Sequence, residues 1–308
     1  MTTDRHLSFY HLLSAEQITK KDIDTILHQA AAFHRGDLGA SEVAKGKILG
    51  SLFFEPSTRT RLSFEAAMLR LGGGVSTVVG ESSSSLKKGE SLSDMARIVS
   101  GYCDIIAMRH PEEGSVDLFS STSSVPVINA GDGANQHPSQ ALVDLYTIYH
   151  IYQRLHTLSI GFVGDLKYGR TVHSLTALLA LFPNQTLYFV SHPSLKISEK
   201  TIVALRASGH RVIETDQLDP VIPEVDVLYV TRVQQERFES EKDYLATKNG
   251  YRITPETLSM ARSHLSILHP LPRTHEICPQ LDHHRVARYF DQARYGLFVR
   301  MALLAKML

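Results

Sequence analysis

Short apolar runs alternate with helical patterns along this chain, and this alternation restricts its fold more than any other feature. Four runs in the first half have the length and composition of buried strands; they lie at 47–54, 74–80, 103–109 and 125–130. Segments with helical spacing separate them, at 57–71, 90–101 and 112–121. Strands and helices that alternate at this spacing form βαβ units, so we predict a parallel sheet.

The alternation restarts after a long helical segment at about 138–152. Further strand candidates follow at 158–164, 186–191, 210–215, 225–231 and 265–270. Helices are also expected near both ends, at 16–34 and at 285–308. We predict an α/β protein of two domains, each a parallel-sheet, doubly wound α/β sandwich, linked by long helices. The predicted first domain is 1–140 plus the C-terminal helix 290–308, and the second is 141–289.

The charge balance argues against a nucleic-acid or membrane partner. The chain has 32 basic and 32 acidic residues, so it has no net charge to attract a polyanion or an anionic membrane. No stretch approaches the ~20 apolar residues that cross a bilayer, and the N-terminus has no signal-peptide pattern. We therefore expect a cytoplasmic protein. Cys103 and Cys278 do not make a disulfide framework or a zinc site, and the histidines lack ligand spacing, so no metal is expected.

The run S-T-R-T-R at 57–61 stands where the first strand passes into a helix. Ser57 occupies the N-cap position, and Pro56 presets the turn. The hydroxyls and Arg59 then lie beside unpaired backbone amides at the positive end of the helix dipole, which suits an anion. The alternative is an ordinary capped helix with solvated arginines, but this composition after a buried strand favours phosphate.

Polar residues recur at other strand ends in the first half. Arg109 ends the third strand, where ligands bind in open α/β sheets. His137 and Gln140 follow a glycine-rich turn and are three residues apart, so they can share a helix face. Lys88 belongs to a polar loop at 82–91, which on its own is typical of a flexible loop.

The second half has similar clusters. Lys167 and Arg170 lie in a strand-to-helix turn whose glycines do not fit a dinucleotide fingerprint. Arg232 and Gln234 follow another strand, and H-P-L-P-R at 269–273 is a stiff loop at a strand end. With no Ser-His-Asp order, metal cluster or paired carboxylates, this cationic set indicates a strongly anionic substrate, or two substrates with one in each domain.

Seven segments together resemble the aspartate/ornithine carbamoyltransferase family, and within it the aspartate enzymes. They are FFEPSTRTRLSFE, LKKGES, MRHP, NAGDGANQHPSQALVDL, GDLKYGRTVHSL, TRVQQER and HPLPR, in the family's order and spacing. The resemblance covers nearly the whole chain. It implies transfer of the carbamoyl group of carbamoyl phosphate to the amine of L-aspartate, which gives N-carbamoyl-L-aspartate and phosphate in pyrimidine biosynthesis, with no cofactor.

The resemblance also implies roles for individual residues. Carbamoyl phosphate would be bound by Ser57, Thr58, Arg59, Thr60, Ser84, Lys88, Arg109, His137 and Gln140. L-Aspartate would be bound by Lys88, Lys167, Arg170, Arg232, Gln234, Leu271 and Pro272. The catalytic residues would be Arg59, Thr60, Lys88, Arg109 and His137. Glu55 would pair across the domains with Arg170 and Arg237.

The resemblance further implies an assembly. In the family, the loop that corresponds to 82–90 comes from a neighbouring subunit, so active sites are shared within a homotrimer. The loop serine is Ser84 by spacing, or Ser85 if the loop is one residue shorter. Some members also bind a separate regulatory chain, and this sequence is closest to that class.

Two other functions stay open at this point. The first is a carbamoyltransferase that uses another amine such as ornithine, which the segments TRVQQER and HPLPR argue against. The second is a non-catalytic anion sensor on the same fold. Such a protein would be expected to lack one of the cationic or histidine residues named above, and all are present.

Overall fold

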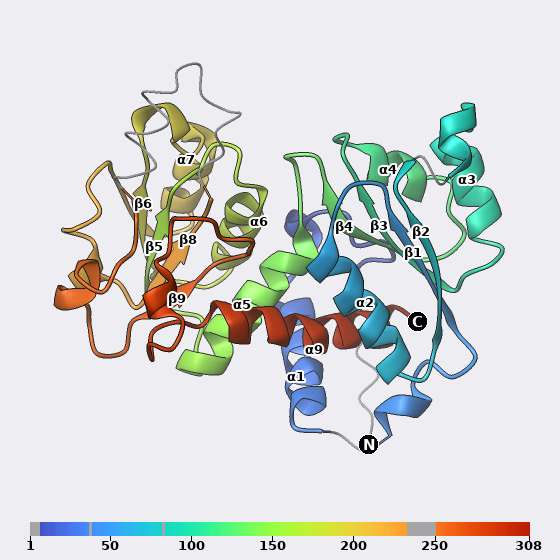
Figure 1. Ribbon diagram of the computed structural model, residues 1–308, viewed down its shortest axis with the longest axis horizontal. Helices are drawn as coiled ribbons and strands as arrows, with labels where there is room; N and C mark the ends of the chain where they lie inside the picture. Colours follow the sequence, from blue (N-terminus) through green and yellow to red (C-terminus); the bar gives the residue numbers. More distant parts are fainter. Residues whose placement is uncertain (1–6, 37–38, 82–83, 233–250) are drawn as a thin grey trace. The chain divides into compact units, whose positions relative to one another are not determined.

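Parallel strands form two separate sheets in the computed structural model, which describes residues 7–36, 39–81, 84–232 and 251–308 (Figure 1). The chain divides into two compact units, Met1–Tyr146 with Arg294–Leu308, and Thr147–Ala293. Each unit contains one of the sheets, which confirms the predicted fold class. The divisions fall inside the helices α5 (Pro138–Tyr152) and α9 (Tyr289–Met307), so long helices link the units.

The first unit has the strand order β2-β1-β3-β4, with every pair parallel. Its strands are β1 (Ile48–Phe53), β2 (Gly74–Val79), β3 (Ile105–His110) and β4 (Val127–Asp132). Its further helices are α1 (Lys20–His34), α2 (Thr58–Arg70), α3 (Leu92–Val99) and α4 (Ser115–Ser120). The chain proceeds from β1 outward to β2 and then returns to β3 on the other side. The switch point of this sheet therefore lies between β1 and β3.

The second unit has the order β7-β6-β5-β8-β9, again with every pair parallel. Its strands are β5 (Ser159–Val163), β6 (Thr186–Val190), β7 (Arg211–Thr215), β8 (Val227–Val230) and β9 (Ser266–Leu268). Among the described residues of this unit, two helices connect strands, α6 (Arg170–Leu179) and α7 (Glu199–Ala207). The strand order reverses between β5 and β8, which is the switch point of this sheet.

Short 3-10 turns complete the described structure. They are η1 (Ala15–Gln17), η2 (Ala40–Glu42), η4 (Ser85–Lys88), η5 (Pro193–Leu195), η6 (Ile222–Glu224), η8 (Thr257–Met260) and η9 (Pro279–Leu281). The predicted helix at 16–34 was wrong at its start, since α1 begins at Lys20. Thr19 and Asp22 form a capping box that begins the helix there. The predicted C-terminal helix also begins later than 285, at Tyr289.

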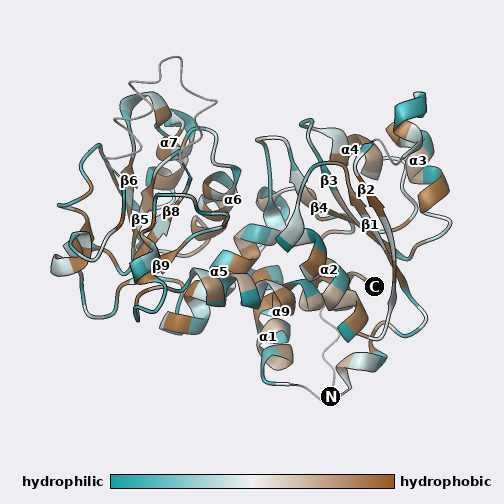
Figure 2. Ribbon diagram, in the orientation of Figure 1, coloured by the Kyte–Doolittle hydropathy of each residue, from teal (hydrophilic) through white to brown (hydrophobic). Residues whose placement is uncertain are grey.

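The apolar residues of each unit gather around its sheet, and Figure 2 shows strands coloured mostly as hydrophobic and loops mostly as hydrophilic. In the first unit the core includes Leu52, Met108 and Phe119, each at most 2% exposed. Cys103 and Cys278 are buried and free, and burial raises the pKa of Cys103. None of the helices in the described ranges combines the length and hydrophobicity that a bilayer span requires.

Candidate active site

The switch point of the first sheet brings together residues from separate stretches of the sequence. Phe53 and Arg109 are register partners at the carboxyl ends of β1 and β3. The Nε of Arg109 donates to the carboxylate of Glu55, and Nη1 donates to Oγ of Ser57 at 3.3 Å. Since ligands bind at this edge of open α/β sheets, the pairing places the predicted phosphate turn where an anion is expected.

The turn before α2 places hydroxyl groups and a guanidinium at the start of a helix. Ser57 is the N-cap, as predicted, but its side chain makes no capping hydrogen bond within the described part of the chain. Thr58 and Arg59 are exposed, whereas Thr60 is 8% exposed. Partial desolvation lowers the pKa of Arg59 from its usual value, and the group still carries its charge near neutrality. Amides, hydroxyls and a guanidinium at one helix start form a site suited to phosphate.

The glycine-rich turn after β4 is built around Asp132, which is fully buried. Its Oδ1 accepts from Nδ2 of Asn129 at 2.9 Å and from the backbone N–H of Gln136 at 3.1 Å. These bonds lead the chain to His137, which is 4% exposed and directly precedes α5. Gln140 lies in the first turn of the same helix and is half-buried. The turn therefore fixes the position of His137 and Gln140, the residues predicted to contact the carbamoyl group.

Within the polar loop after β2, for which we predicted a flexible loop, Ser85–Lys88 form the 3-10 turn η4. Oγ of Ser84 donates to the carbonyl of Glu81 at 2.9 Å, and Ser85 is hydrogen-bonded to Glu90. Lys88 is exposed, and it makes no hydrogen bond or ion pair to any residue in the described ranges. A lysine that none of the described residues engages is compatible with a role in a neighbouring subunit.

The second unit arranges cationic residues at its own switch point. The turn after β5 passes close to β8 because Gly164 has a φ of 114° and a Cβ there would lie 2.5 Å from the carbonyl oxygen of Thr231. Lys167 is exposed on this turn, and Arg170 is the first residue of α6. Arg232 follows β8, the neighbour of β5. A cation at a helix N-terminus adds to the positive dipole end, which favours anionic ligands.

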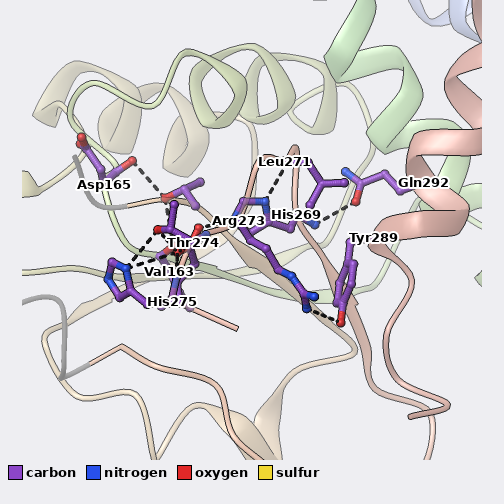
Figure 3. Close-up of polar contacts among 11 residues, drawn as sticks. Val163, Asp165, His269, Leu271, Arg273, Thr274, His275, Tyr289 and Gln292 are labelled. Atoms are coloured by element: carbon purple, nitrogen blue, oxygen red, sulfur yellow. Dashed lines mark hydrogen bonds and ion pairs between the residues drawn. The ribbon is translucent and has the colours of Figure 1, made fainter. Parts of the chain in front are cut away.

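A buried carboxylate–imidazole pair holds the loop 269–273, in which Figure 3 labels His269, Leu271 and Arg273. Nδ1 of His269 accepts from the backbone N–H of Leu271 at 2.8 Å. The other ring nitrogen therefore carries the proton, and it donates to Glu276 at 2.8 Å. His269 is 1% exposed and Glu276 is 3% exposed. Side chains that are buried and bonded on both sides fix the orientation of Leu271 in the loop.

The other side of this loop is held by Arg273. Its Nη2 donates to Asp282 at 2.5 Å. Its Nη1 donates to the hydroxyl of Tyr289 at 3.0 Å (Figure 3). Leu271 adopts a φ of 53°, a conformation that a branched side chain rarely takes without support. Its two anchors, His269 and Arg273, provide that support. The exposed Pro272 lies between Leu271 and Arg273.

The Glu276 carboxylate gives a pH-dependent prediction. Burial raises its pKa, but hydrogen bonds from His269 and from backbone N–H groups outweigh burial and lower it from 4.5 to about 2. Because the folded pKa is the lower one, the stabilisation is complete above about pH 4.5 and is lost as the pH falls toward 2. A difference of that size corresponds to about 3 kcal/mol.

We therefore expect Glu276→Gln to lower the free energy of unfolding by about 3 kcal/mol at pH 7, and this gap should narrow below pH 4.5. Urea denaturation at several pH values measures the gap. Glu199→Gln, on the exposed start of α7, is the matched control and should give a small gap at every pH. A gap for Glu276→Gln that stays constant down to pH 3 would contradict the assigned role of the carboxylate.

Gln234 and Arg237 are outside the described residues. Glu55 is bonded to Arg109 in its own unit, and its pairing with Arg170 and Arg237 stays a prediction. Among the residues that the structure describes, no three His, Cys, Asp or Glu side chains are grouped as metal ligands would be.

The sequence reasoning missed two buried charged residues of the first unit, Asp144 and Arg300. Asp144 is fully buried and Arg300 is 3% exposed. Two signals were available. Arg300 is the one charged residue in the run 295–304, and such a residue needs a buried partner. Gln140 and Asp144 have the i, i+4 spacing of neighbours on a helix.

Two family models match the two halves of this chain. One, described as the carbamoyl-P binding domain of aspartate/ornithine carbamoyltransferase, matches residues 10–150. The other, described as the Asp/Orn binding domain of the same enzymes, matches residues 156–307. The chain belongs to the aspartate/ornithine carbamoyltransferase family. The resemblance that the seven segments indicated is confirmed.

Curated relatives in this carbamoyltransferase family are similar along their whole length. The aspartate carbamoyltransferase catalytic subunit of Archaeoglobus fulgidus is 49% identical over 97% of this chain and 99% of its own length. The catalytic subunit of Thermococcus kodakarensis is 48% identical over 95% of both chains. The similarity is therefore to a complete catalytic subunit.

Solved structures of carbamoyltransferases agree with the fold. The catalytic subunit of M. jannaschii aspartate transcarbamoylase gives a TM-score of 0.91 at 48% identity, and it covers 97% of this chain and 98% of that one. The Trypanosoma cruzi enzyme in complex with N-(phosphonacetyl)-L-aspartic acid gives 0.90 at 37% identity, over 96% and 95% of the two chains. Another T. cruzi structure contains carbamoyl phosphate and aspartate.

Proposed function

We propose that this chain is the catalytic subunit of an aspartate carbamoyltransferase. It transfers the carbamoyl group of carbamoyl phosphate to the amine of L-aspartate, an early step of pyrimidine biosynthesis. The observation that carries this proposal is the placement of cationic residues at the switch points of both sheets. The names and bound compounds of the relatives support the choice of substrates.

The first unit is proposed to bind carbamoyl phosphate. The helix start at 57–60 holds the phosphoryl oxygens through hydroxyls, amides and Arg59. Arg109, already in contact with Ser57, lies at the end of the neighbouring strand and adds a second guanidinium. His137 donates to the carbamoyl oxygen, and Gln140 accepts from the carbamoyl NH₂. Lys88 and Ser84 complete the site.

The second unit is proposed to bind L-aspartate. Its two carboxylates are held by Lys167, Arg170 and Arg232, with Gln234 beside them. Guanidinium groups suit this task because their planar forks bind carboxylates in a bidentate manner. The backbone of Leu271 and Pro272 contributes carbonyl oxygens that accept from the substrate amine. The rigid anchoring of that loop supports such a role.

The reaction needs positioning and charge stabilisation more than a covalent intermediate. The neutral amine attacks the carbamoyl carbon, so a C–N bond forms while the C–O bond to phosphate breaks. The phosphate leaves with the electron pair and takes the proton of the amine. Negative charge grows on the carbamoyl oxygen, and Arg109, His137 and Thr60 donate to it. Holding two anions in reacting geometry supplies much of the remaining acceleration.

The test of this function is an amine-dependent assay with labelled carbamoyl phosphate. We expect label in N-carbamoyl-L-aspartate and none in the citrulline that L-ornithine would give. The matched control is the Arg232→Ala variant, which should lose activity with aspartate because one carboxylate loses its partner. If label appears only with ornithine, the amine substrate is ornithine and not aspartate. Binding of phosphate without turnover of either amine would indicate an anion sensor.

We also propose an assembly and a location. The chain forms a homotrimer whose active sites are shared, because Lys88 and Ser84 are supplied to a neighbouring subunit. A separate regulatory chain joins this trimer in a larger holoenzyme, as the words "catalytic subunit" in the names of the relatives suggest. The enzyme works in the cytoplasm, on small soluble substrates and without a cofactor.

Mixing two inactive variants tests the shared site. Chains with Arg59→Ala and chains with Lys88→Ala, dissociated and reassembled one to one, should recover about a quarter of wild-type activity. In a cyclic trimer, about one site in four then combines an intact Arg59 with an intact Lys88. The matched control mixes Arg59→Ala with Arg109→Ala, which belong to the same side of one site and should recover nothing. A first mixture that stays inactive would contradict sharing.

A further inference from the structure

The C-terminal helix α9 carries a buried guanidinium in an apolar setting. Arg300 is 3% exposed, and its Cζ lies 5.1 Å from the ring centroid of Phe64 on α2. Its Nε has no hydrogen-bond partner among the described residues. A guanidinium in such a place is costly unless a nearby negative charge compensates it. The position of the Arg300 guanidinium therefore requires an explanation beyond packing.

The backbone of α9 makes room for this group. Gly296 lies one turn before Arg300, and a Cβ at Gly296 would lie 2.4 Å from Nη1 of Arg300. Any side chain at Gly296 would therefore displace the guanidinium. A glycine inside a helix costs about 1 kcal/mol relative to alanine, so its use here indicates that the location of the guanidinium matters.

The compensating charge is Asp144 on α5. Burial lowers the pKa of Arg300 to about 10, and the charge of Asp144 opposes that change, so Arg300 stays protonated near neutral pH. Asp144 is fully buried. The interior of the first unit thus holds a buried cation and a buried anion together, on helices that are far apart in the sequence.

Asp144 is also bonded to a proposed substrate contact. Nε2 of Gln140 donates to Oδ1 of Asp144 at 2.7 Å. An ionised carboxylate only accepts hydrogen bonds, so the NH₂ of Gln140 must face it. The amide oxygen of Gln140 then points the other way, and it is available as an acceptor. The same amide turned by 180° would present a donor instead.

We propose that Asp144, with its charge balanced by Arg300, is a positioning residue that presents the amide oxygen of Gln140 to the NH₂ group of carbamoyl phosphate. This inference rests on the function proposed above. The orientation gives specificity for the substrate. An acceptor at this place binds the NH₂ of carbamoyl phosphate and has no partner on acetyl phosphate, which carries a methyl group there. Sites built to bond an N–H discriminate strongly against analogues that lack it.

The test compares the two acyl phosphates in Asp144→Asn. An asparagine side chain can donate to Gln140, which lets the amide turn. We expect the KM for carbamoyl phosphate to rise about tenfold, the size of one lost hydrogen bond. The inhibition constant of acetyl phosphate should change by less than about twofold, because that compound does not use the acceptor. An equal change in both constants would overturn the inference.

A double-mutant cycle separates positioning from simple destabilisation. Once Gln140→Ala has removed the acceptor, Asp144→Asn should raise the KM for carbamoyl phosphate by less than about twofold more. A full tenfold increase in that background would show that Asp144 does not act through Gln140. Asp22→Asn is the matched control, since Asp22 is 1% exposed and caps α1. It should lower stability and leave both constants unchanged.

Gly296→Ala gives a second route, and it decides the question if Asp144→Asn does not fold. It displaces the guanidinium without altering any charged residue, so it should raise the KM for carbamoyl phosphate more than the acetyl phosphate constant. Equal effects on both constants would overturn the inference. A wild-type enzyme that forms no N-carbamoyl-L-aspartate would instead overturn the proposed function, and this inference with it.

Discussion

Arg59→Ala should lower kcat/KM for carbamoyl transfer by on the order of a hundredfold to a thousandfold, while the chain keeps its fold. The expected loss is large because Arg59 is proposed to face charge that grows as phosphate leaves, and one preorganised donor is worth that much in an enclosed site. The side chain is exposed at the start of α2, so its removal leaves no buried cavity. Steady-state kinetics and thermal denaturation measure the two effects.

The matched control for this prediction is Arg61→Ala. Arg61 is on the same helix, two residues further on, and its Nε lies 4.0 Å from a carboxylate oxygen of Glu65. It has the same charge as Arg59 but no proposed contact with substrate. We expect its removal to change kcat/KM by less than about threefold, because a partly exposed pair of this kind contributes little. Equal losses for both variants would remove the specific role of Arg59.

Much of the fold could be predicted because parallel strands are buried on both faces. Such strands appear as short continuous apolar runs, and all nine predicted runs correspond to the strands β1 to β9 in the described chain. Their ends differ by one or two residues, as in β3, which begins at Ile105 and extends to His110. The register between β3 and β4 also shifts between Met108 and His110, which no local pattern in the sequence indicates.

The positions of site residues could be predicted in part. Arg109 and Ser57 are far apart in sequence, yet the rule that ligands bind at the carboxyl ends of strands assigns both to one edge. Their contact depends on β1 and β3 being neighbours, which only the strand order establishes. The hydroxyl of Ser57 also bonds Arg109 where a helix cap was expected, because the guanidinium competes for it.

The pairings of the supporting residues could not be predicted from local pattern. Glu276 holds His269 although it is seven residues away in the sequence. The segment H-P-L-P-R indicated only a loop that its prolines stiffen. Arg300 and Asp144 are on different helices, and periodicity along one helix cannot identify a partner on another. Such residues are buried and charged, so their partners emerge only when the fold is known.

The central claim is that one site takes both anions, and a compound that contains both tests it most directly. N-(phosphonacetyl)-L-aspartic acid, which is bound in the T. cruzi structure, joins a phosphonate to aspartate. We expect it to bind one per chain and at least about a hundredfold more tightly than phosphonoacetamide or succinate alone, because it uses the contacts of both substrates at once.

Titration calorimetry on the wild type, Arg59→Ala and Arg232→Ala is the decisive measurement, with exposed Arg211→Ala as the matched control. The account predicts that Arg59→Ala and Arg232→Ala, from different units, each weaken binding of the joined compound by about a hundredfold or more, and that Arg211→Ala leaves it unchanged. The contrary result is a joined compound that binds no more tightly than phosphonoacetamide and is indifferent to Arg232→Ala. That result would mean that the two units do not serve one reaction.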